Sequence, residues 1–329
     1  MKRTCTFLAA AAATLCTIAC NKEMGQENAP ALEDEKCEIT VGLGSAATKS
    51  TTVTDEDQEE VKMLQVFVFR GEQLDAYAKV SNATEVTLSC TKGEREIYAL
   101  VNDIDRSTIS TKTALLACVS DFTAPFTRGF AMIGSKTETL PSASKITIDV
   151  NRLNSRIVLK GICNSLTSPA LAALSFTVEG IYLLNAPQDI NLGLNNAPTL
   201  WKHKHTLDDP STEFDAETYS KPIELNTTWD SVDHIFFCYP NPTVDDSQSD
   251  TWCARHTRLV VKVKIGTTSY YYPITLPVLQ NNKSYEISNL TITRPGSDHP
   301  DKPVSFQDCT FDINVKPWVV VPVTDGTTI

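Results

Sequence analysis

The sequence predicts an all-β protein with few short helices, organised as two β-sandwich domains of the transthyretin-like, Greek-key kind. Short apolar runs recur along the chain, Gly, Asn and Pro interrupt them at close intervals, and only one segment has helical spacing. The chain has 329 residues, enough for about two domains of roughly 150 residues each. We place an N-terminal domain at residues 50–148 and a C-terminal domain at residues 149–329.

The first residues have the features of a bacterial export signal. "MKR" supplies positive charge, and "TFLAAAAATLCTIA" is an apolar run too short to span a bilayer stably. The run ends in Ala19 before Cys20, a pattern similar to a lipobox, in which the cysteine becomes the acylated first residue of the mature chain. We therefore predict a signal peptide over residues 1–19 and a lipid, such as palmitate, on Cys20. An ordinary secretory signal that is cleaved nearby is the alternative.

A polar, Pro-interrupted tether follows the signal and leads into a regular strand. The strand is predicted over residues 37–43, and its apolar side chains share one face: Cys37, Ile39, Val41 and Leu43. The small-residue loop after it holds Lys49, the only basic residue between Lys36 and Lys62. A cut after Lys49 would remove the strand without damaging the next one, so the expected processing position is Lys49–Ser50.

The segment from residue 62 to 149 is predicted to form strands with one helical interlude. "KMLQVFVF" is apolar on both faces and should be a central strand, with turns expected at Gly71 and Gly93. "TEVTLS" and "EREIYALV" are further strands. Helical spacing is found in one set of apolar residues: Leu115, Cys118, Val119 and Phe122.

The C-terminal domain is predicted from a second series of strands. "LSFTVEGIYLLNA" precedes a long polar excursion over residues 187–230, and "DHIFFCYP" follows it. A hairpin is expected to turn near Gly266, and "KSYEISNLTI" is a further strand. The last apolar segment, residues 309–323, contains Pro317 and Pro322, which cannot donate ladder hydrogen bonds and therefore restrict it to an edge or an inserted position.

Charge and cysteine content limit the classes of partner and fold. The net charge of −11 disfavours nucleic acid as a partner. Outside the leader and the first strand, six cysteines remain: Cys90, Cys118, Cys163, Cys238, Cys253 and Cys309. Their spacings do not select a disulfide pairing. Cys238 with Cys253 is the most local option, and buried free thiols are the alternative.

The sequence contains no motif of an enzyme or a metal site. His203 and His205 lie on one side of an extended stretch, but flanking lysines favour a solvated loop. Cys253 and His256 lack a third residue that would orient a nucleophilic pair. No Gly-rich phosphate loop, GxSxG or HExxH motif is present. We expect a non-enzymatic protein without a metal or cofactor.

The order of these features resembles the fimbrillins, the subunits of type V pili in Bacteroidales. The resemblance rests on the lipobox, the alternating strand, the basic loop residue, "VKMLQVFVFRGEQLDAY", "KGEREIYALVND" and the ending "NNKSYEISNLTITRPGSDHPDKPVSFQDCTFDINVKPWVVV". It covers essentially residues 20–328. The relatives carry Arg where this chain has Lys49, which leaves the identity of the protease open.

The resemblance implies a mechanism of assembly by strand exchange. Residues 20–49 would be a lipidated propeptide whose strand fills a groove until a trypsin-like surface protease cuts after Lys49. A neighbouring subunit would then insert its donor strand, within residues 309–329, by β-augmentation. The donor residues would be Trp318, Val319, Val321 and Val323. The implied partners are other pilin subunits, outer-membrane lipid before cleavage and an adhesion ligand on a host or bacterial cell, and the implied location is the outer membrane and the extracellular fimbrium.

Two other functions fit parts of the same sequence. The chain can be read as a subunit that keeps its lipid, either a pilus anchor or a surface glycan-binding lipoprotein with an aromatic platform made from Trp201, Trp229, Trp252 and Tyr270–Tyr272. A hydrolase on a sandwich scaffold is the third and least supported function.

Overall fold

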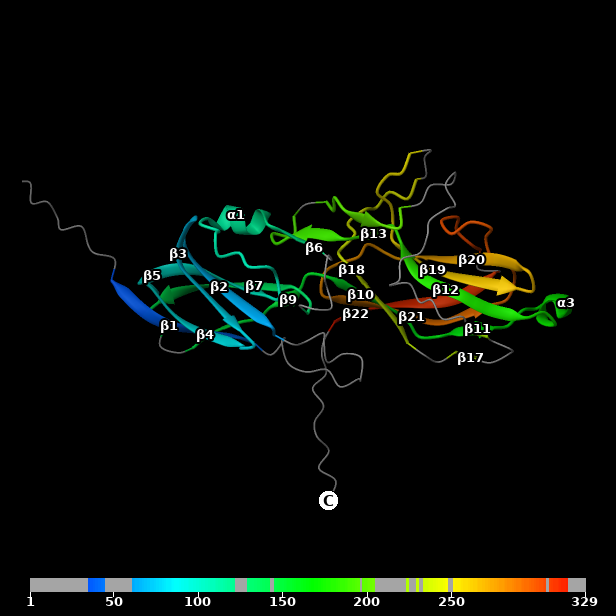
Figure 1. The fold of residues 1–329 in the computed structure, drawn as a ribbon, viewed down its shortest axis with the longest axis horizontal. Coiled ribbons are helices and arrows are strands. Elements are labelled where there is room, and N and C mark those ends of the chain that lie inside the picture. Colours follow the sequence, from blue (N-terminus) through cyan, green and yellow to red (C-terminus); the bar gives the residue numbers. More distant parts are fainter. Residues whose placement is uncertain are drawn as a thin grey trace, which may run out of the picture. The chain divides into compact units, whose positions relative to one another are not determined.

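Strands dominate the part of the chain that the computed structural model describes (Figure 1). The described residues are 35–44, 61–121, 129–142, 145–195, 197–204, 223–224, 229–230, 233–247, 251–305 and 308–318. The predicted signal peptide, Cys20, Lys49, Ser50 and the donor residues Val319, Val321 and Val323 lie outside them. The described residues from Lys36 onward belong to one compact unit, so the division at residue 149 stays a prediction.

A five-stranded antiparallel sheet forms the middle of the N-terminal half. In spatial order its strands are β3 (Gln73–Ser81), β2 (Met63–Arg70), β5 (Gly93–Val101), β7 (Met132–Leu140) and β9 (Asn151–Arg152). β2 is buried on both faces, as its sequence predicts. Leu64, Val66 and Val68 face one apolar core, and Phe67 and Phe69 face another.

A second, three-stranded sheet packs on the Leu64 face of β2. Its strands are β4 (Glu85–Thr91), β1 (Lys36–Leu43) and β8 (Ile146–Ile148), with β1 in the middle. Apolar side chains of the two sheets form one core, which makes this half of the chain a sandwich. The opposite face of β2 is covered in part by the helix α1 (Lys112–Ala117) through the buried Leu115.

The predicted helix is shorter than its apolar spacing suggests. Thr111 caps α1 by accepting a hydrogen bond from the Ala114 backbone N–H at 3.2 Å. The helix ends at Ala117, and the next residues form β6 (Val119–Asp121), which pairs with β14 (Asp189–Asn191). The assignment of Val119 to the helix is therefore wrong, because a partner strand about 70 residues away in the sequence overrides the local pattern.

The C-terminal half has two larger sheets that enclose the largest apolar core. One contains β17 (Trp229–Asp230), β11 (Ile162–Asn164), β21 (Lys283–Ile292), β10 (Ser155–Leu159) and β18 (His234–Cys238), with β22 (Cys309–Pro317) along the other side of β21. The other contains β16 (Ile223–Glu224), β12 (Phe176–Leu184), β19 (Arg258–Ile265) and β20 (Thr268–Thr275). A second short helix, α3 (Pro169–Ala172), precedes β12.

Two predicted hairpins close on glycines with left-handed backbone. Gly71 (φ 60°) joins β2 to β3, and Gly266 (φ 61°) joins β19 to β20. Glycine adopts this conformation without the steric cost that a Cβ brings. The predicted polar excursion over residues 187–230 contains short strands in its described parts. It contains β14 and β15 (Trp201–Lys202), which pairs with β13 (Ala186–Pro187).

Candidate functional site

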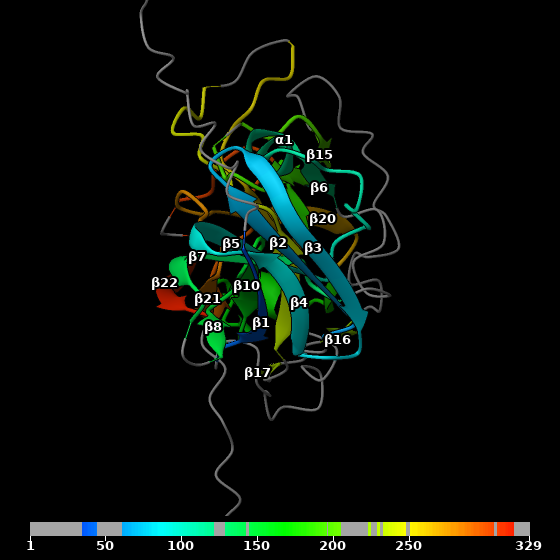
Figure 2. The ribbon, with the colours of Figure 1, turned by 90° about the vertical axis from the view of Figure 1, so that its left-hand side faces the viewer.

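The strand β1 occupies a slot between β4 and β8 (Figure 2). It pairs antiparallel with β4 along its length, from Lys36 opposite Thr91 to Gly42 opposite Glu85. On its other side, residues 41–43 pair parallel with β8. β1 therefore satisfies backbone donors and acceptors of both neighbours, and its removal would leave two unpaired strand edges.

The side chains of β1 complete the core of the N-terminal sandwich. Ile39 is 5% exposed and Val41 is fully buried, and Cys37 and Leu43 pack against the same core from partly buried positions. The slot is lined by apolar side chains of β4, β8 and the five-stranded sheet: Val86, Leu88, Ile146, Ile148, Leu64 and Ile97. Burial of a large apolar side chain is worth about 1.5–3 kcal/mol, so β1 contributes substantially to this half of the molecule.

The outer face of β1 is narrow and is crossed by an ion pair. Glu85 at the start of β4 pairs with Lys145 just before β8, and a Cβ added to Gly42 would lie 2.1 Å from Lys145 Cε. On the same face, Thr40 and Thr87 share a hydrogen bond of 2.9 Å between their hydroxyl oxygens. The ion pair is exposed and adds little stability. Glycine at residue 42 leaves room for it to pass over the strand.

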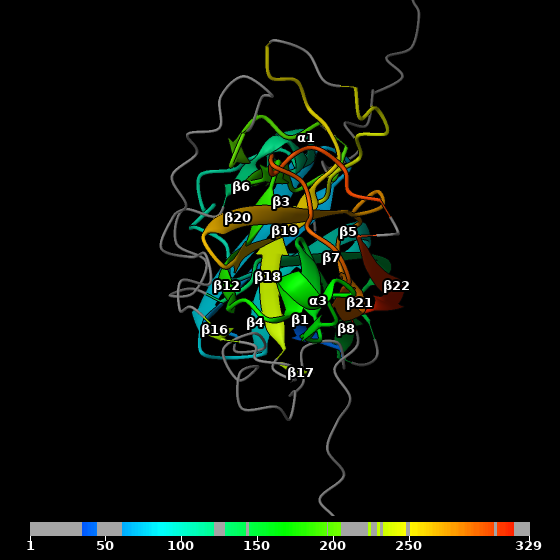
Figure 3. The ribbon, with the colours of Figure 1, turned by 90° about the vertical axis from the view of Figure 1, so that its right-hand side faces the viewer.

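The C-terminal strand β22 lies at an edge of its sheet (Figure 3). Among the described residues it pairs only with β21, in agreement with the restriction predicted from Pro317. Cys309 is buried, and Phe311 and Ile313 pack on the C-terminal core. Val315 is 52% exposed, so not all of the apolar side chains that alternate along this strand are buried within the subunit.

Trp318 ends the described chain in an aromatic cage and is 8% exposed. Its ring stacks on Phe237 at 5.6 Å between centroids and meets Phe130 edge to face at 5.6 Å. The guanidinium carbon of Arg152 lies 4.5 Å from the ring centroid. The backbone N–H of Trp318 donates to the Asn282 carbonyl at 3.0 Å. The chain is thus firmly held at Trp318, the first of the predicted donor residues, immediately before Val319.

The cysteines and histidines considered from the sequence make other contacts where the structure describes them. Cys238 and Cys253 are free thiols rather than a disulfide, since Cys238 is buried in the C-terminal core and the Cys253 thiol donates to the Ser247 carbonyl. His256 Nδ1 lies 3.2 Å from the Leu276 carbonyl oxygen. Within the described ranges, no three His, Cys, Asp or Glu side chains gather as a metal site would need. His205 lies outside these ranges.

Two of the tryptophans considered for a glycan platform, Trp201 and Trp252, pack against each other. Trp201 and Trp252 meet edge to face at 5.4 Å between ring centroids, and Trp252 Nε1 donates to Asn185 Oδ1 at 2.9 Å. This arrangement holds the loops together and does not present a flat stacking surface. No helix in the described ranges is long and apolar enough to cross a membrane.

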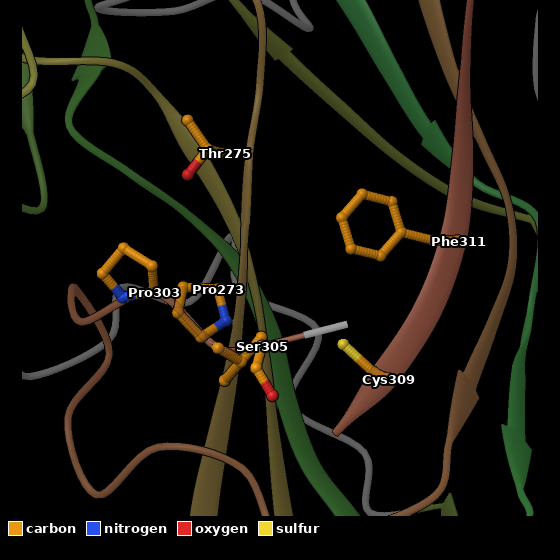
Figure 4. Close-up of a pocket in the computed structure, with 7 residues that line it drawn as sticks. Pro273, Thr275, Pro303, Ser305, Cys309 and Phe311 are labelled. Carbon is orange, nitrogen blue, oxygen red and sulfur yellow. The ribbon is translucent and has the colours of Figure 1, made fainter. Parts of the chain in front are cut away.

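A small cavity of about 270 Å³ lies between β20 and β22 (Figure 4). Its lining residues are Pro273, Thr275, Pro303, Val304, Ser305, Cys309 and Phe311. The only group in this lining that titrates is the Cys309 thiol, whose pKa is raised to about 11 by burial and by the neighbouring Asp308. The lining offers no acid–base pair, so we do not assign catalysis to it.

The fold and the position of β1 define a class of protein: β-sandwich proteins in which the first described strand lies in the middle of a sheet. Residues 36–169, which begin with β1, match the family model "Major fimbrial subunit protein (FimA)". Curated relatives from Porphyromonas gingivalis are the major fimbrium subunits FimA type-2, 23% identical over 98% of both chains, and FimA type-3, 24% identical over 95% of this chain and 96% of the relative.

A solved fimbrilin (FimA) from Porphyromonas gingivalis has the same fold. It superposes with a TM-score of 0.63 at 17% identity and covers 87% of this chain and 98% of its own. The chain is therefore similar to FimA major fimbrial subunits along almost its whole length, and the family model matches its residues 36–169. The matched family model and the curated relatives are named as fimbrial subunits, which is the non-enzymatic class that the sequence predicts.

Proposed function

We propose that this protein is a pilin that is exported as a lipoprotein, cut after Lys49 and polymerised by donor-strand exchange. As a fimbrial subunit it acts at the cell surface, in a polymer with other pilin subunits. Before the cut, lipid on Cys20 holds it at the outer membrane. After the cut it joins the extracellular fimbrium, where an adhesion ligand on a host or bacterial cell would be its further partner.

Strand exchange is supported by two facts about β1: where it lies in its sheet and where it lies in the sequence. In the sheet β1 is central, but in the sequence it is the first described strand. One cut in the segment between β1 and β2 would separate residues 20–49 from the body and interrupt none of the other strands that the structure describes. Proteolysis can therefore open the slot while the five-stranded sheet and the C-terminal half stay intact.

The proposed donor is the apolar segment after Trp318. Val319, Val321 and Val323 alternate as strand residues do and would take the positions of Ile39, Val41 and Leu43. The exchange is nearly balanced in buried apolar area, so irreversible loss of the old strand drives it. A donor strand would again satisfy the backbone groups of β4 and β8.

Substitution of Lys49 by alanine tests the processing step. We expect Lys49→Ala to slow cleavage by a trypsin-like protease by roughly 100-fold or more, because the charged pocket of the protease is left unpaired. N-terminal sequencing of the product should give Ser50 for the wild type, and an acyl label on Cys20 should leave with the fragment. Lys62→Ala is the matched control. The Lys62 backbone N–H is already bound to Asn102 Oδ1 at 2.9 Å, which makes Lys62 a poor site for proteolysis.

If the Lys49→Ala variant forms filaments at the normal rate, the processing position is wrong. If filaments contain wild-type subunits that keep residues 20–49 and their lipid, the protein is a lipid-retaining subunit such as a pilus anchor.

A further inference from the structure

Cys37 and Cys90 are opposite each other in the β1–β4 ladder. In an antiparallel ladder, every second pair of opposite residues is joined by backbone hydrogen bonds. The Leu43 backbone N–H donates to the carbonyl of Thr84, opposite it, at 2.9 Å. Cys37 and Cys90 lie an even number of residues away along the two strands, so they are also a pair joined by backbone hydrogen bonds.

Cα atoms in such pairs lie about 5.5 Å apart, inside the roughly 4.4–6.8 Å that a disulfide spans, but their Cβ atoms lie near the wide end of about 4.5–5.5 Å, beyond the roughly 3.5–4.5 Å of a relaxed disulfide. A bond between Cys37 and Cys90 would therefore be strained and readily reduced, as a reversible link needs to be. Both side chains pack on the same apolar core, which places them on the same face of the sheet.

Cys37 and Cys90 are both free thiols in this structure, and they differ in their access to solvent. Cys90 is 3% exposed, whereas Cys37, the second residue of β1, is partly exposed. Burial and, to a smaller extent, the neighbouring Cys37 thiol raise the pKa of the Cys90 thiol to about 12. Beside them, Arg95 Nε binds Asp75 Oδ2 at 3.0 Å, and the Thr91 N–H donates to the same oxygen at 2.9 Å. These contacts fix the end of β4 and therefore the position of Cys90.

We propose that Cys37 and Cys90 form a disulfide that holds β1 in its slot after the chain is cut, so that strand exchange requires reduction of this bond. The inference rests on the strand-exchange function proposed above. The pair would act as a latch: the oxidised subunit keeps its own strand, and the reduced subunit can accept a donor.

The oxidant is a disulfide, RSSR, either a small molecule or an oxidised dithiol protein. The Cys37 thiolate attacks one sulfur of RSSR, the S–S bond breaks, and RS⁻ leaves and takes up a proton. Cys90 then loses its proton and attacks the Cys37 sulfur of the mixed disulfide, which expels the second RS⁻. Two protein thiols have lost two electrons and two protons, and RSSR has become two RSH. A reducing thiol pair reverses both steps and releases the strand.

Peptide mapping of the full-length precursor tests whether the bond forms. The detergent-solubilised protein is treated with glutathione disulfide, its remaining thiols are alkylated, and it is digested without reductant for mass spectrometry. We expect a peptide in which Cys37 is linked to Cys90. Cys37→Ser should lack it, and Cys253→Ser, which removes another partly exposed thiol, should retain it. Absence of this peptide, or linkage of Cys90 to a different cysteine, overturns the proposal.

Limited trypsin treatment then tests whether the bond acts as a latch. On a gel without reductant, the fragment that contains β1 should stay with the body of the oxidised wild type and separate from Cys37→Ser. Filament yield from the cut, oxidised wild type should be at least about tenfold below that from the reduced protein, because a tethered strand competes at high effective concentration.

Equal yields from the oxidised and reduced protein, with the linkage mapped, overturn the latch. If reduced wild type and Cys37→Ser both fail to polymerise after the cut, strand exchange itself is wrong, and the mapped disulfide still stands.

Discussion

Deletion of residues 319–329 is expected to give a subunit that folds, is exported and is cut, but forms no filaments. Trp318, the last described residue, is held in place within its own subunit by Phe130, Phe237 and Arg152. The thermal unfolding midpoint of the truncated precursor should therefore stay close to that of the full chain. The loss of polymerisation should be complete, because the deletion removes all three valines that would fill the slot.

Electron microscopy of purified, protease-treated subunits measures this effect directly. A shorter deletion, of residues 325–329, is the matched control, since it removes only the polar end and keeps Val319, Val321 and Val323. The control should polymerise. Filaments from the longer deletion would assign the donor role to another segment and favour the lipid-retaining anchor.

The Asp301→Ala substitution is expected to lower the free energy of unfolding by about 3–5 kcal/mol. Asp301 is fully buried between two buried guanidinium groups: Arg255 Nη2 lies 2.6 Å from Oδ2, and Arg258 Nε lies 2.8 Å from Oδ1. Loss of this carboxylate leaves two buried positive charges close together. Arg258 keeps its ion pair with Asp246 at 2.8 Å. Asp246 is partly exposed and carries one negative charge, so it cannot neutralise both arginines.

Urea unfolding of the precursor followed by circular dichroism measures this cost. Asp298→Ala is the control, because Asp298 pairs with Lys302 at 3.7 Å on the surface, where an ion pair contributes about 1 kcal/mol or less. A loss below about 1 kcal/mol in Asp301→Ala would show that the cluster does not support the C-terminal half as we infer.

The sequence predicts the strands whose pattern is local. β2 is apolar on both faces and is central in its sheet, and the hairpins at Gly71 and Gly266 turn where glycine permits a left-handed backbone. The alternation that predicts β1 also tells which of its side chains enter the core. These features depend on residues that are close in the chain, so periodicity and turn chemistry are sufficient.

Features that depend on distant partners could not be predicted in this way. β1 is flanked by β4 and by β8, which lies more than 100 residues further along the chain, and the sequence contains no signal for this neighbour. The opposition of Cys37 and Cys90 depends on register across two strands. Cys37 lies in the segment that is predicted to be removed, so the cysteine spacings outside that segment do not indicate its pairing with Cys90. Val119 follows helical spacing and yet forms a strand, because β14 is available to pair with it.

Trp318 shows how the structure refines a prediction from sequence. The resemblance places Trp318 among the donor residues, but its ring lies inside the cage of its own subunit. We therefore propose that Trp318 anchors the base of the donor segment and that the exchange begins at Val319. Cys20, Lys49 and Ser50 lie outside the described residues, so their roles stay predictions.

Cysteine crosslinking between neighbouring subunits tests most directly whether a donor strand takes the place of β1. Val321 should occupy the position of Val41, which lies opposite Val86 in β4. In filaments of mixed subunits with Cys37 and Cys90 replaced by serine, Val321→Cys in one subunit should link to Val86→Cys in its neighbour. It should not link to Thr87→Cys, whose side chain is on the exposed face of the same strand. Filaments in which Val321→Cys links to neither position, or to both equally, would contradict donor-strand exchange at this slot.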